Sequence, residues 1–414
     1  MSILDKNLSE ITFKNIEEFC AEGIPEGIQL DYKLTRPEKG FSKHFAGLSN
    51  QKGGLIILGI DEDRNTGIPK AWVGIKKDGK LLEQIHHDAA NVDPFPEYDI
   101  HYTDEVDGHV FLLIRIFEGS QTPYYVFNDS NLWVRTGNIR KPIDLANPKQ
   151  AEILFNKREK AIAQRNILLR QADYSFDNGL HRAELERLTK ISEKQDGQAS
   201  IVYGNTLGEK SSICKVYLLP YYPNINFATP QDLLVFSNEL NERPSREFET
   251  IPYGIFQFIW SQYNGYVECC QLFSKGLIYY YSDVLTGDYD TGGKIELRFV
   301  AGAVHRVINL SKKYFQKYLF TGSLIGGITL SDVRALKLFP IKTRGIAFDP
   351  GELKTCLLPD YHLEMNLTSQ VLFSQELLNK WYFKQIKEIY ISLGLRAPSD
   401  LLLESFCKEN DFTF

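Results

Sequence analysis

A short apolar run near the amino terminus limits the folds open to this chain. Residues Leu55 to Ile60 read LIILGI and are apolar at every position except Gly59. A run of this length without polar alternation is typical of a strand buried on both faces, at the centre of a sheet covered by helices. Asp61 follows the run directly. We therefore expect its carboxylate at the mouth of the sheet, where ligands commonly bind in such folds.

A second strand is predicted just upstream, with two charged side chains on one face. Residues 29–34 alternate, so Asp31 and Lys33 project from one face while their neighbours project from the other. Glu26 lies five residues before Asp31, and on a straight strand these two side chains would point to opposite faces. The proline and glycine that flank Glu26 favour a bend, which would bring Glu26 back over Asp31.

Three carboxylates, Glu26, Asp31 and Asp61, are thus predicted near the ends of adjacent strands. Carboxylates gathered in one place repel each other unless a cation or a proton joins them. Ligands that are all oxygen favour Mg²⁺ or Mn²⁺ over zinc. Such an ion can activate water and neutralise a phosphate oxygen, while Lys33 would stabilise developing negative charge. The residues alone leave an ordinary surface strand with exposed acids as the alternative.

Four sequence blocks follow the order found in the Schlafen/AlbA-type domain, which this chain resembles over roughly a third of its length. The blocks are PEGIQLDYK, a segment ending in NQKGG, the apolar run ending in GID, and LWVRTGN. The resemblance implies an α+β fold with a mixed sheet and flanking helices. In nuclease members, it implies that Glu26, Asp31 and Asp61 are the catalytic, metal-binding carboxylates, that Lys33 supports them, and that the substrate is structured RNA, notably tRNA. Asp31 departs from the family, which usually has glutamate there.

Other members of this family are described as DNA-binding or ATP-binding. The alternative function is therefore a non-catalytic regulator that binds nucleic acid. Such a regulator could also bind ATP and respond to it. The sequence has no G-x-x-x-x-G-K-[ST] motif, which disfavours a P-loop ATPase.

Basic residues after the predicted site are candidates for contacts with nucleic acid. Arg135 lies on a strand that borders the site in the family, which makes it a candidate phosphate clamp, with a structural ion pair as the alternative. Residues 140–170 contain eight basic and three acidic residues. A helix over Pro148–Gln171 would either line an RNA channel or present a solvated face. The candidate nucleic-acid-binding residues are Arg135, Arg140, Lys141, Lys157 and Arg158.

Length and composition predict two or three globular domains in 414 residues. We expect a Schlafen/AlbA-like catalytic domain over 1–147, a basic connector helix over 148–172, and a second α+β domain over 173–414 that acts as a sensor or specificity module. The net charge of −6 excludes a uniformly basic surface, so a nucleic-acid site must be a local patch. No apolar run is long enough to span a membrane, and six scattered cysteines without a C-x-x-C pair favour a reducing cytoplasm.

The second half of the chain has no motif that points to chemistry. A search for a second copy of the acidic and glycine-rich blocks finds none. Family nucleases that grip tRNA use two related lobes, so we expect a homodimer to complete the clamp. The resemblance also suggests a role in antiphage or stress defence. Within this half, the patterns predict strands at Leu233–Phe236 and Ile295–Val300, and a helix at Asn178–Lys194 that is separate from Pro148–Gln171.

Overall fold

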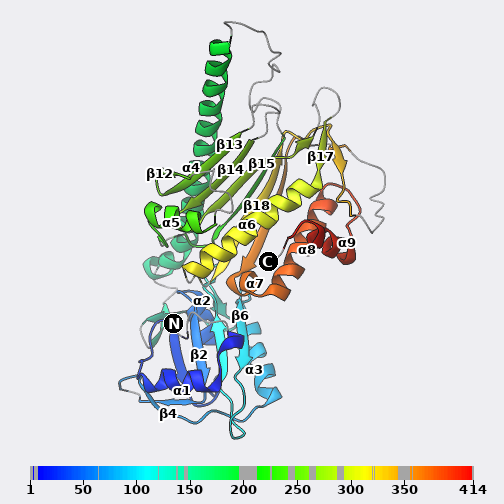
Figure 1. Cartoon of the computed structure of the whole chain (residues 1–414). Coiled ribbons are helices and arrows are strands. Elements are labelled where there is room, and N and C mark those ends of the chain that lie inside the picture. Colours follow the sequence, from blue (N-terminus) through cyan, green and yellow to red (C-terminus); the bar gives the residue numbers. More distant parts are fainter. Residues whose placement is uncertain are drawn as a thin grey trace. The chain divides into compact units, whose positions relative to one another are not determined.

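The computed structural model describes residues 3, 8–63, 65–119, 121–136, 139–143, 148–194, 212–223, 226–240, 248–260, 267–286, 293–318, 320, 322–343, 355–356 and 358–412. The chain divides into two compact units. Unit 1 comprises Met1–Ala163 with Phe320–Ser323, and unit 2 comprises Gln164–Leu319 with Leu324–Phe414. Helices and mixed or antiparallel sheets occur in both, which confirms the predicted α+β class (Figure 1).

Unit 1 contains two four-stranded sheets and a hairpin. The first sheet has the order β1-β2-β7-β6, from Leu30–Lys33, Gly54–Leu58, Leu112–Ile116 and Tyr98–Tyr102. Its β1 and β2 are parallel, and its other pairs are antiparallel. The second sheet has the order β10-β9-β8-β5, from Ile139–Ile143, Leu132–Thr136, Tyr125–Val126 and Val92–Asp93. The hairpin consists of β3 (Ile60–Glu62) and β4 (Pro69–Trp72).

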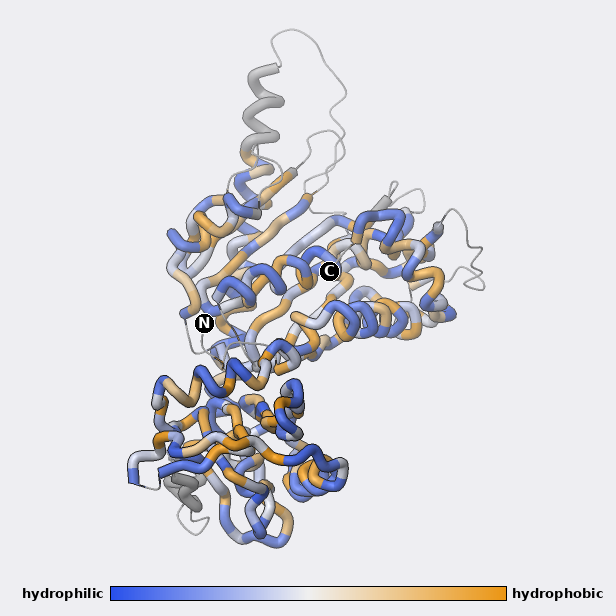
Figure 2. The backbone as a smooth tube through the Cα atoms, turned by 60° about the horizontal axis from the view of Figure 1, so that its bottom comes forward, coloured by the Kyte–Doolittle hydropathy of each residue, from blue (hydrophilic) through white to orange (hydrophobic). Residues whose placement is uncertain are grey.

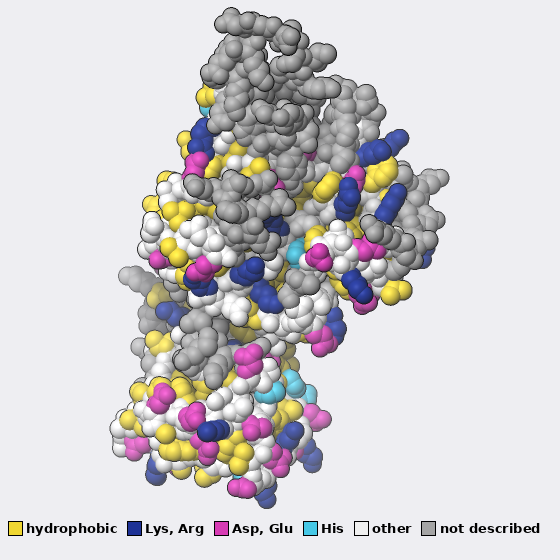
Figure 3. Space-filling model, viewed as in Figure 1, with side chains coloured by type: hydrophobic (Ala, Val, Ile, Leu, Met, Phe, Trp, Pro, Cys, Tyr) yellow, Lys and Arg dark blue, Asp and Glu magenta, His cyan; other side chains and the backbone are white. Residues whose placement is uncertain are grey.

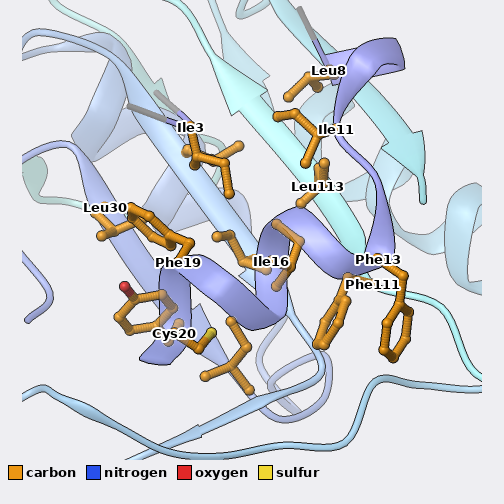
Figure 4. Packing of buried hydrophobic residues seen from close by; sticks show 14 residues of the cluster. Ile3, Leu8, Ile11, Phe13, Ile16, Phe19, Cys20, Leu30, Phe111 and Leu113 are labelled. Carbon is orange, nitrogen blue, oxygen red and sulfur yellow. The ribbon is translucent and has the colours of Figure 1, made fainter. Parts of the chain in front are cut away.

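Strand β2 lies at the centre of its sheet and is buried on both faces, as its apolar run predicts. Leu55 and Ile57 pack into one core cluster, with α1 (Phe13–Ala21) and β1. Ile56 and Leu58 pack into a second cluster, with α2 (Ser42–Ser49) and α3 (Gly79–Ala90). Figure 4 shows the first cluster, in which side chains of α1 lie against Leu30 and Leu113. The sheet is thereby held between two apolar layers.

Two glycines end α2 and set the start of β2. Gly53 has a φ of +69°, and its N–H donates to the carbonyl of Leu48. A Cβ at Gly53 would lie 2.5 Å from the backbone oxygen of Ile116, and one at Gly54 would lie 2.7 Å from that of Gln29. Neighbouring backbone segments therefore pack directly on these glycines. They serve as a helix stop and a close backbone contact.

Unit 2 is built on a seven-stranded sheet with the order β12-β13-β14-β15-β11-β18-β20. These strands span Glu249–Ile251, Gly254–Trp260, Val267–Phe273, Ile278–Asp283, Ile213–Pro220, Ser323–Ser331 and Tyr361–Thr368. A smaller sheet joins β16 (Leu285–Thr286), β17 (Lys294–Glu296) and β19 (Lys337–Phe339). The helices described in this part are α4 (Pro148–Lys194) from Gln164 onwards, α5 (Pro230–Leu240), α6 (Leu297–Lys317), α7 (Ser369–Phe373), α8 (Gln375–Ser392) and α9 (Asp400–Glu409). Buried residues recur every three or four positions along α6, as expected of a helix that covers a core on one side. Figure 2 shows hydrophobic and hydrophilic residues interspersed along the backbone of the chain.

Three predictions of local structure are wrong. Leu233–Phe236 belongs to helix α5, because Thr229 and Asp232 cap its first turn reciprocally with hydrogen bonds of 2.9 and 3.2 Å. Ile295–Val300 is a strand only as far as Glu296, after which α6 begins. The two helices predicted between Pro148 and Lys194 form one continuous helix, α4 (Pro148–Lys194).

The surface carries charges of both signs. On the face of unit 1 seen in Figure 3, lysine and arginine side chains are interspersed with aspartate and glutamate. This mixture agrees with the chain's small negative net charge. No helix in the described ranges combines the length and the apolar character needed to cross a membrane.

Candidate functional site

The chain turns between Glu26 and strand β1, and this turn places the Glu26 side chain over the strand. The N–H of Gly27 donates to the carbonyl of Leu30 at 3.1 Å, which closes the turn. The N–H of Tyr32 then donates to Oε1 of Glu26 at 2.6 Å. On the other side, the N–H of Glu26 donates to the carbonyl of Gly67 in the β3–β4 hairpin at 2.8 Å. The predicted bend is confirmed, and it holds the Glu26 carboxylate above the backbone of β1.

The ammonium of Lys33 lies at the centre of a carboxylate cluster. Its Nζ is 2.8 Å from Oδ1 of Asp31 and 3.2 Å from Oε1 of Glu26. A third carboxylate, Glu62 on β3, lies 3.2 Å away through Oε1. The backbone carbonyl of Tyr32 also accepts a hydrogen bond from Nζ. Asp31 and Glu26 have side chains that are 3% and 6% exposed, so the carboxyl groups of the cluster are largely desolvated.

Among the described residues, no ion pair or hydrogen bond joins Asp61 to Lys33, although Asp61 is the acid that the sequence predicts there. The prediction treats Leu55–Ile60 as one strand, but Gly59 has a φ of +104° and ends β2 at Leu58. The chain then enters β3, whose pairing with β4 shifts register between Asp61 and Glu62. A bulge of this kind re-aims side chains. Among the described residues, Glu62 is the acid of β3 that forms an ion pair with Lys33.

Arg135 lies beneath the cluster rather than on the surface. Its guanidinium donates to the carbonyls of Gly27 at 2.8 Å and Leu30 at 2.9 Å. It also contacts both oxygens of Asp31, at 3.3 and 3.2 Å. The residue is 3% exposed. Of the two roles that the sequence left open, this geometry favours the structural ion pair over the phosphate clamp.

His44 is a member of the site that sequence reasoning missed. It comes from α2, is 1% exposed, and places Nε2 at 3.2 Å from Oδ2 of Asp31. A single histidine inside an apolar helix carries no local signal of such a role. The packing of α2 on the sheet brings it to the carboxylate, so Asp31 is surrounded by Lys33, Arg135 and His44.

The pKa values of the two buried carboxyl groups, Glu26 and Asp31, are shifted in opposite directions. Burial, together with hydrogen bonds to Asp31 and Glu62, raises the pKa of Glu26 to about 9. Burial by itself would raise the pKa of Asp31 as well, but the hydrogen bond with Glu26 and the surrounding cationic side chains hold it below its usual range. At pH 7, without a bound metal ion, Glu26 therefore carries a proton and Asp31 is ionised. Such a pair is typical of functional sites.

The donor set suits a hard divalent cation, but its present arrangement does not form a metal cage. In the described part of the chain, no three histidine, cysteine, aspartate or glutamate side chains are grouped closely enough to hold a metal ion. The ammonium of Lys33 lies among the carboxylates of Glu26, Asp31 and Glu62. Because all of its neighbours there are oxygen atoms, the same groups would suit Mg²⁺ or Mn²⁺ once the ammonium moves.

The other candidate nucleic-acid-binding residues differ in their surroundings. Lys157 forms an ion pair with Glu118 at 2.6 Å and donates to the carbonyl of Gln51 at 2.7 Å, and burial lowers its pKa. Arg158 is exposed on α4. The side chains of Arg140 and Lys141 lie outside those that the structure describes.

Asn50 ties the end of α2 to the strand that carries Arg135. Its Nδ2 donates to the carbonyls of Tyr124 at 2.8 Å and Trp133 at 2.9 Å. Its Oδ1 accepts from the N–H of Tyr124 at 2.7 Å, and the residue is 1% exposed. The motif Asn-x-x-Gly-Gly thus has a structural explanation, in which Asn50 holds β9 in place behind Asp31.

We expect Asn50→Ala to lower the free energy of unfolding by about 2–4 kcal/mol, because it leaves several buried backbone groups without hydrogen-bond partners. Chemical denaturation of the full chain measures this loss. Asn65→Ala, at an exposed loop asparagine, is the matched control and should change the stability by less than about 0.5 kcal/mol. Equal stability of the two variants would contradict the role given to Asn50.

Comparison with known proteins identifies a domain around this site. The model of the family described as Schlafen, AlbA_2 matches residues 26–144. Among solved structures, the N-terminal domain of a RecG-related protein from Nitrosomonas europaea is similar at 16% sequence identity, with a TM-score of 0.25. The similarity covers 31% of this chain and 89% of that one. No curated protein matches the chain.

Proposed function

We propose that this chain, whose residues 26–144 match the model of the Schlafen, AlbA_2 family, is a divalent-metal-dependent endoribonuclease that cuts structured RNA such as tRNA. The family includes nucleases. The observation that carries the proposal is the convergence of Glu26, Asp31 and Lys33 in a desolvated cluster within the matched region. The fold has brought together two acids with separated pKa values and a lysine, which is a suitable set for phosphodiester hydrolysis.

Each side chain of the cluster has a role in this proposal. Glu26 and Asp31, with one acid of β3, would hold Mg²⁺ or Mn²⁺, which when bound lowers the pKa of a water molecule and neutralises a phosphate oxygen. Lys33 stabilises the negative charge that develops on the phosphate. Arg135 and His44 fix the Asp31 carboxylate by contacts on its buried side. These two residues are positioning residues, since they act through Asp31.

The proposals for the substrate and for the oligomeric state are based on the family resemblance alone. We propose tRNA as substrate, a homodimer as the form that grips it, and defence against phage or stress as the setting. The basic side chains of α4, such as the exposed Arg158, are candidates for contacts with the RNA backbone, which would make binding salt-dependent.

Incubation of the purified full chain with total tRNA tests the proposal. We expect fragments with Mn²⁺ and none with EDTA, resolved on a denaturing gel, because the acids of the cluster need the ion to act. Fragments of equal yield in EDTA would contradict metal dependence.

The second candidate function is a regulator that binds nucleic acid without cutting it. One observation favours it: within the described residues, the acids of the cluster are not arranged as a metal site. A shift of tRNA on a native gel without fragments in Mn²⁺ is the result that this alternative predicts.

A further inference from the structure

Unit 2 contains a cavity of about 320 Å³ beside the start of helix α5. Three segments line it: the loop that leads into α5, the turn between β12 and β13, and the turn between β14 and β15. Small-molecule sites are typically cavities of about 300–1,000 Å³ with apolar walls and a few polar groups. The size of this cavity therefore suits a small ligand.

Backbone hydrogen bonds fix the three segments to one another. The N–H of Phe227 donates to the carbonyl of Ser274 at 2.7 Å, and the N–H of Ser274 donates to the carbonyl of Tyr253 at 2.7 Å. The ring of Phe227 packs edge-on against Tyr314 and Phe315 of α6, with ring centroids 6.2 and 6.1 Å apart. The walls of the cavity are thus held in place by the fold itself.

One lining residue has a buried hydroxyl group that lacks a partner. Ser274 is 3% exposed, and its Oγ makes no hydrogen bond among the described residues. Buried hydroxyl groups in folded proteins nearly always have a hydrogen-bond partner. Because Ser274 borders the cavity, a polar group of a bound ligand is a suitable partner for it.

The charge at the cavity favours a cation over an anion. The N–H and hydroxyl of Thr229 donate to Oδ2 of Asp232 at 2.9 and 2.7 Å, which lowers the pKa of this carboxyl group and keeps it ionised at neutral pH. A helix N-terminus often binds anions, but here Asp232 already supplies the negative charge, and the first helical residue, Pro230, has no N–H. Asp232 has no ion pair within the described part of the chain, since the nearby Lys317 pairs with Glu239 at 2.7 Å.

Two aromatic side chains complete the lining. Phe227 borders the cavity, and Tyr253 borders it with 60% of its surface exposed. Aromatic rings attract ammonium groups to their faces and pack well against other rings. They therefore suit the apolar body of a ligand whose charged end lies near Asp232.

We propose that this cavity binds a small primary amine with an aromatic or short apolar body and a polar group at its other end. The ammonium donates to Asp232, the body packs on Phe227 and Tyr253, and the polar group pairs with the hydroxyl of Ser274. Every residue of the cavity belongs to unit 2, so the inference is independent of the proposed nuclease function. It gives a class of ligand to the sensor role expected for this part of the chain.

Binding of three probes to the full chain, measured by calorimetry, tests the charge of the ligand. The probes share a hydroxyphenyl body and differ at the other end: tyramine has an ammonium, tyrosol a hydroxyl and 3-(4-hydroxyphenyl)propionate a carboxylate. We expect tyramine to bind at least about tenfold more tightly than tyrosol, because a charge-assisted hydrogen bond is the stronger one, and the propionate to bind more weakly still. Absence of saturable tyramine binding, or equal affinity for the three probes, would overturn the proposal.

Asp232→Asn tests which group recognises the ammonium. Its amide oxygen can still accept from Thr229, so the start of α5 keeps its cap, and circular dichroism checks the fold. The preference for tyramine over tyrosol should fall below about twofold, whereas Glu404→Gln, at an exposed acid of α9, should leave it unchanged. A preference that persists in folded Asp232→Asn would overturn the role of Asp232. Should this variant not fold, Tyr253→Ala at an exposed position replaces it and should weaken tyramine binding at least about threefold.

Phenethylamine, which is tyramine without its phenolic hydroxyl, tests the role of Ser274. Wild type should bind tyramine at least about threefold more tightly than phenethylamine, because one hydrogen bond to a buried group is lost. In Ser274→Ala the two amines should bind within about twofold of each other. Equal affinity of the two amines for wild type would contradict the pairing of the ligand with Ser274.

Discussion

Glu26→Gln should abolish RNA cleavage and, in EDTA, make the protein more stable at pH 8 than the wild type. Cleavage should fall by at least about 10³-fold, since an amide can neither serve as an anionic ligand nor accept a proton as a carboxylate does. The gain in stability follows from the pKa of Glu26, which burial and the hydrogen bonds to Asp31 and Glu62 raise to about 9. The neutral glutamine resembles the protonated acid, and its oxygen can still accept from the N–H of Tyr32.

The sign of the pH dependence follows from this raised value. A carboxyl group whose pKa is higher in the folded than in the unfolded chain stabilises the fold fully below its unfolded pKa of 4.5. That stabilisation is lost as the pH rises towards about 9. Wild type should therefore lose stability over this window, and Glu26→Gln should not. We expect the two proteins to be equally stable near pH 4.5 and to differ by about 2–4 kcal/mol at pH 8.

Denaturation at several pH values in EDTA measures the difference, and Glu38→Gln, at an exposed acid, is the matched control. A variant that is less stable than wild type at pH 8 would show that Glu26 is ionised in the folded protein. Such a result would mean that the cluster retains its negative charge without a bound metal ion. We expect a variant that is more stable but inactive, because an active-site acid that is buried for function lowers the stability of the fold.

Sequence patterns alone predict much of unit 1. The apolar run correctly predicts that β2 is central and buried on both faces, and the alternation around Asp31 and Lys33 correctly predicts their shared face. The bend at Glu26 follows from its proline and glycine neighbours. Each of these correct predictions depends on residues that lie within a few positions of one another in the sequence.

The members of the cluster that were not predicted depend on tertiary structure. Glu62 pairs with Lys33 on a hairpin that begins after Gly59 adopts a positive φ, and an apolar run broken by one glycine does not reveal that backbone angle. His44 reaches Asp31 only through the packing of α2 on the sheet. The burial of Arg135 likewise depends on how β9 packs against α2. In unit 2, the helix cap at Thr229 overrides the strand-like run that follows it.

Arg135→Met should destabilise the protein more than the substitution of an exposed basic residue such as Arg158. Its guanidinium contacts Asp31 at 3.2 Å and two backbone carbonyls, and the side chain is 2% exposed. Removing one partner of a buried ion pair leaves an uncompensated charge and typically costs about 3–5 kcal/mol. For a unit of this size, the expected fall in melting temperature is roughly 10 °C. Arg135→Lys should recover only part of it, because an ammonium cannot reproduce the fork of donors.

The same variant separates the two roles that the sequence left open for Arg135. A phosphate clamp would lose RNA affinity on substitution and keep its stability, whereas a positioning residue would lose stability and loosen β1. Hydrogen–deuterium exchange across Leu30–Lys33 reports on the second outcome, and Arg158→Met, at an exposed arginine of α4, is the control for charge alone. Slow exchange and an unchanged melting temperature in Arg135→Met, together with weaker tRNA binding, would refute the structural role. Because the guanidinium contacts both oxygens of Asp31, we expect the opposite: faster exchange in β1, and loss of the ordered carboxylate on which the proposed chemistry depends.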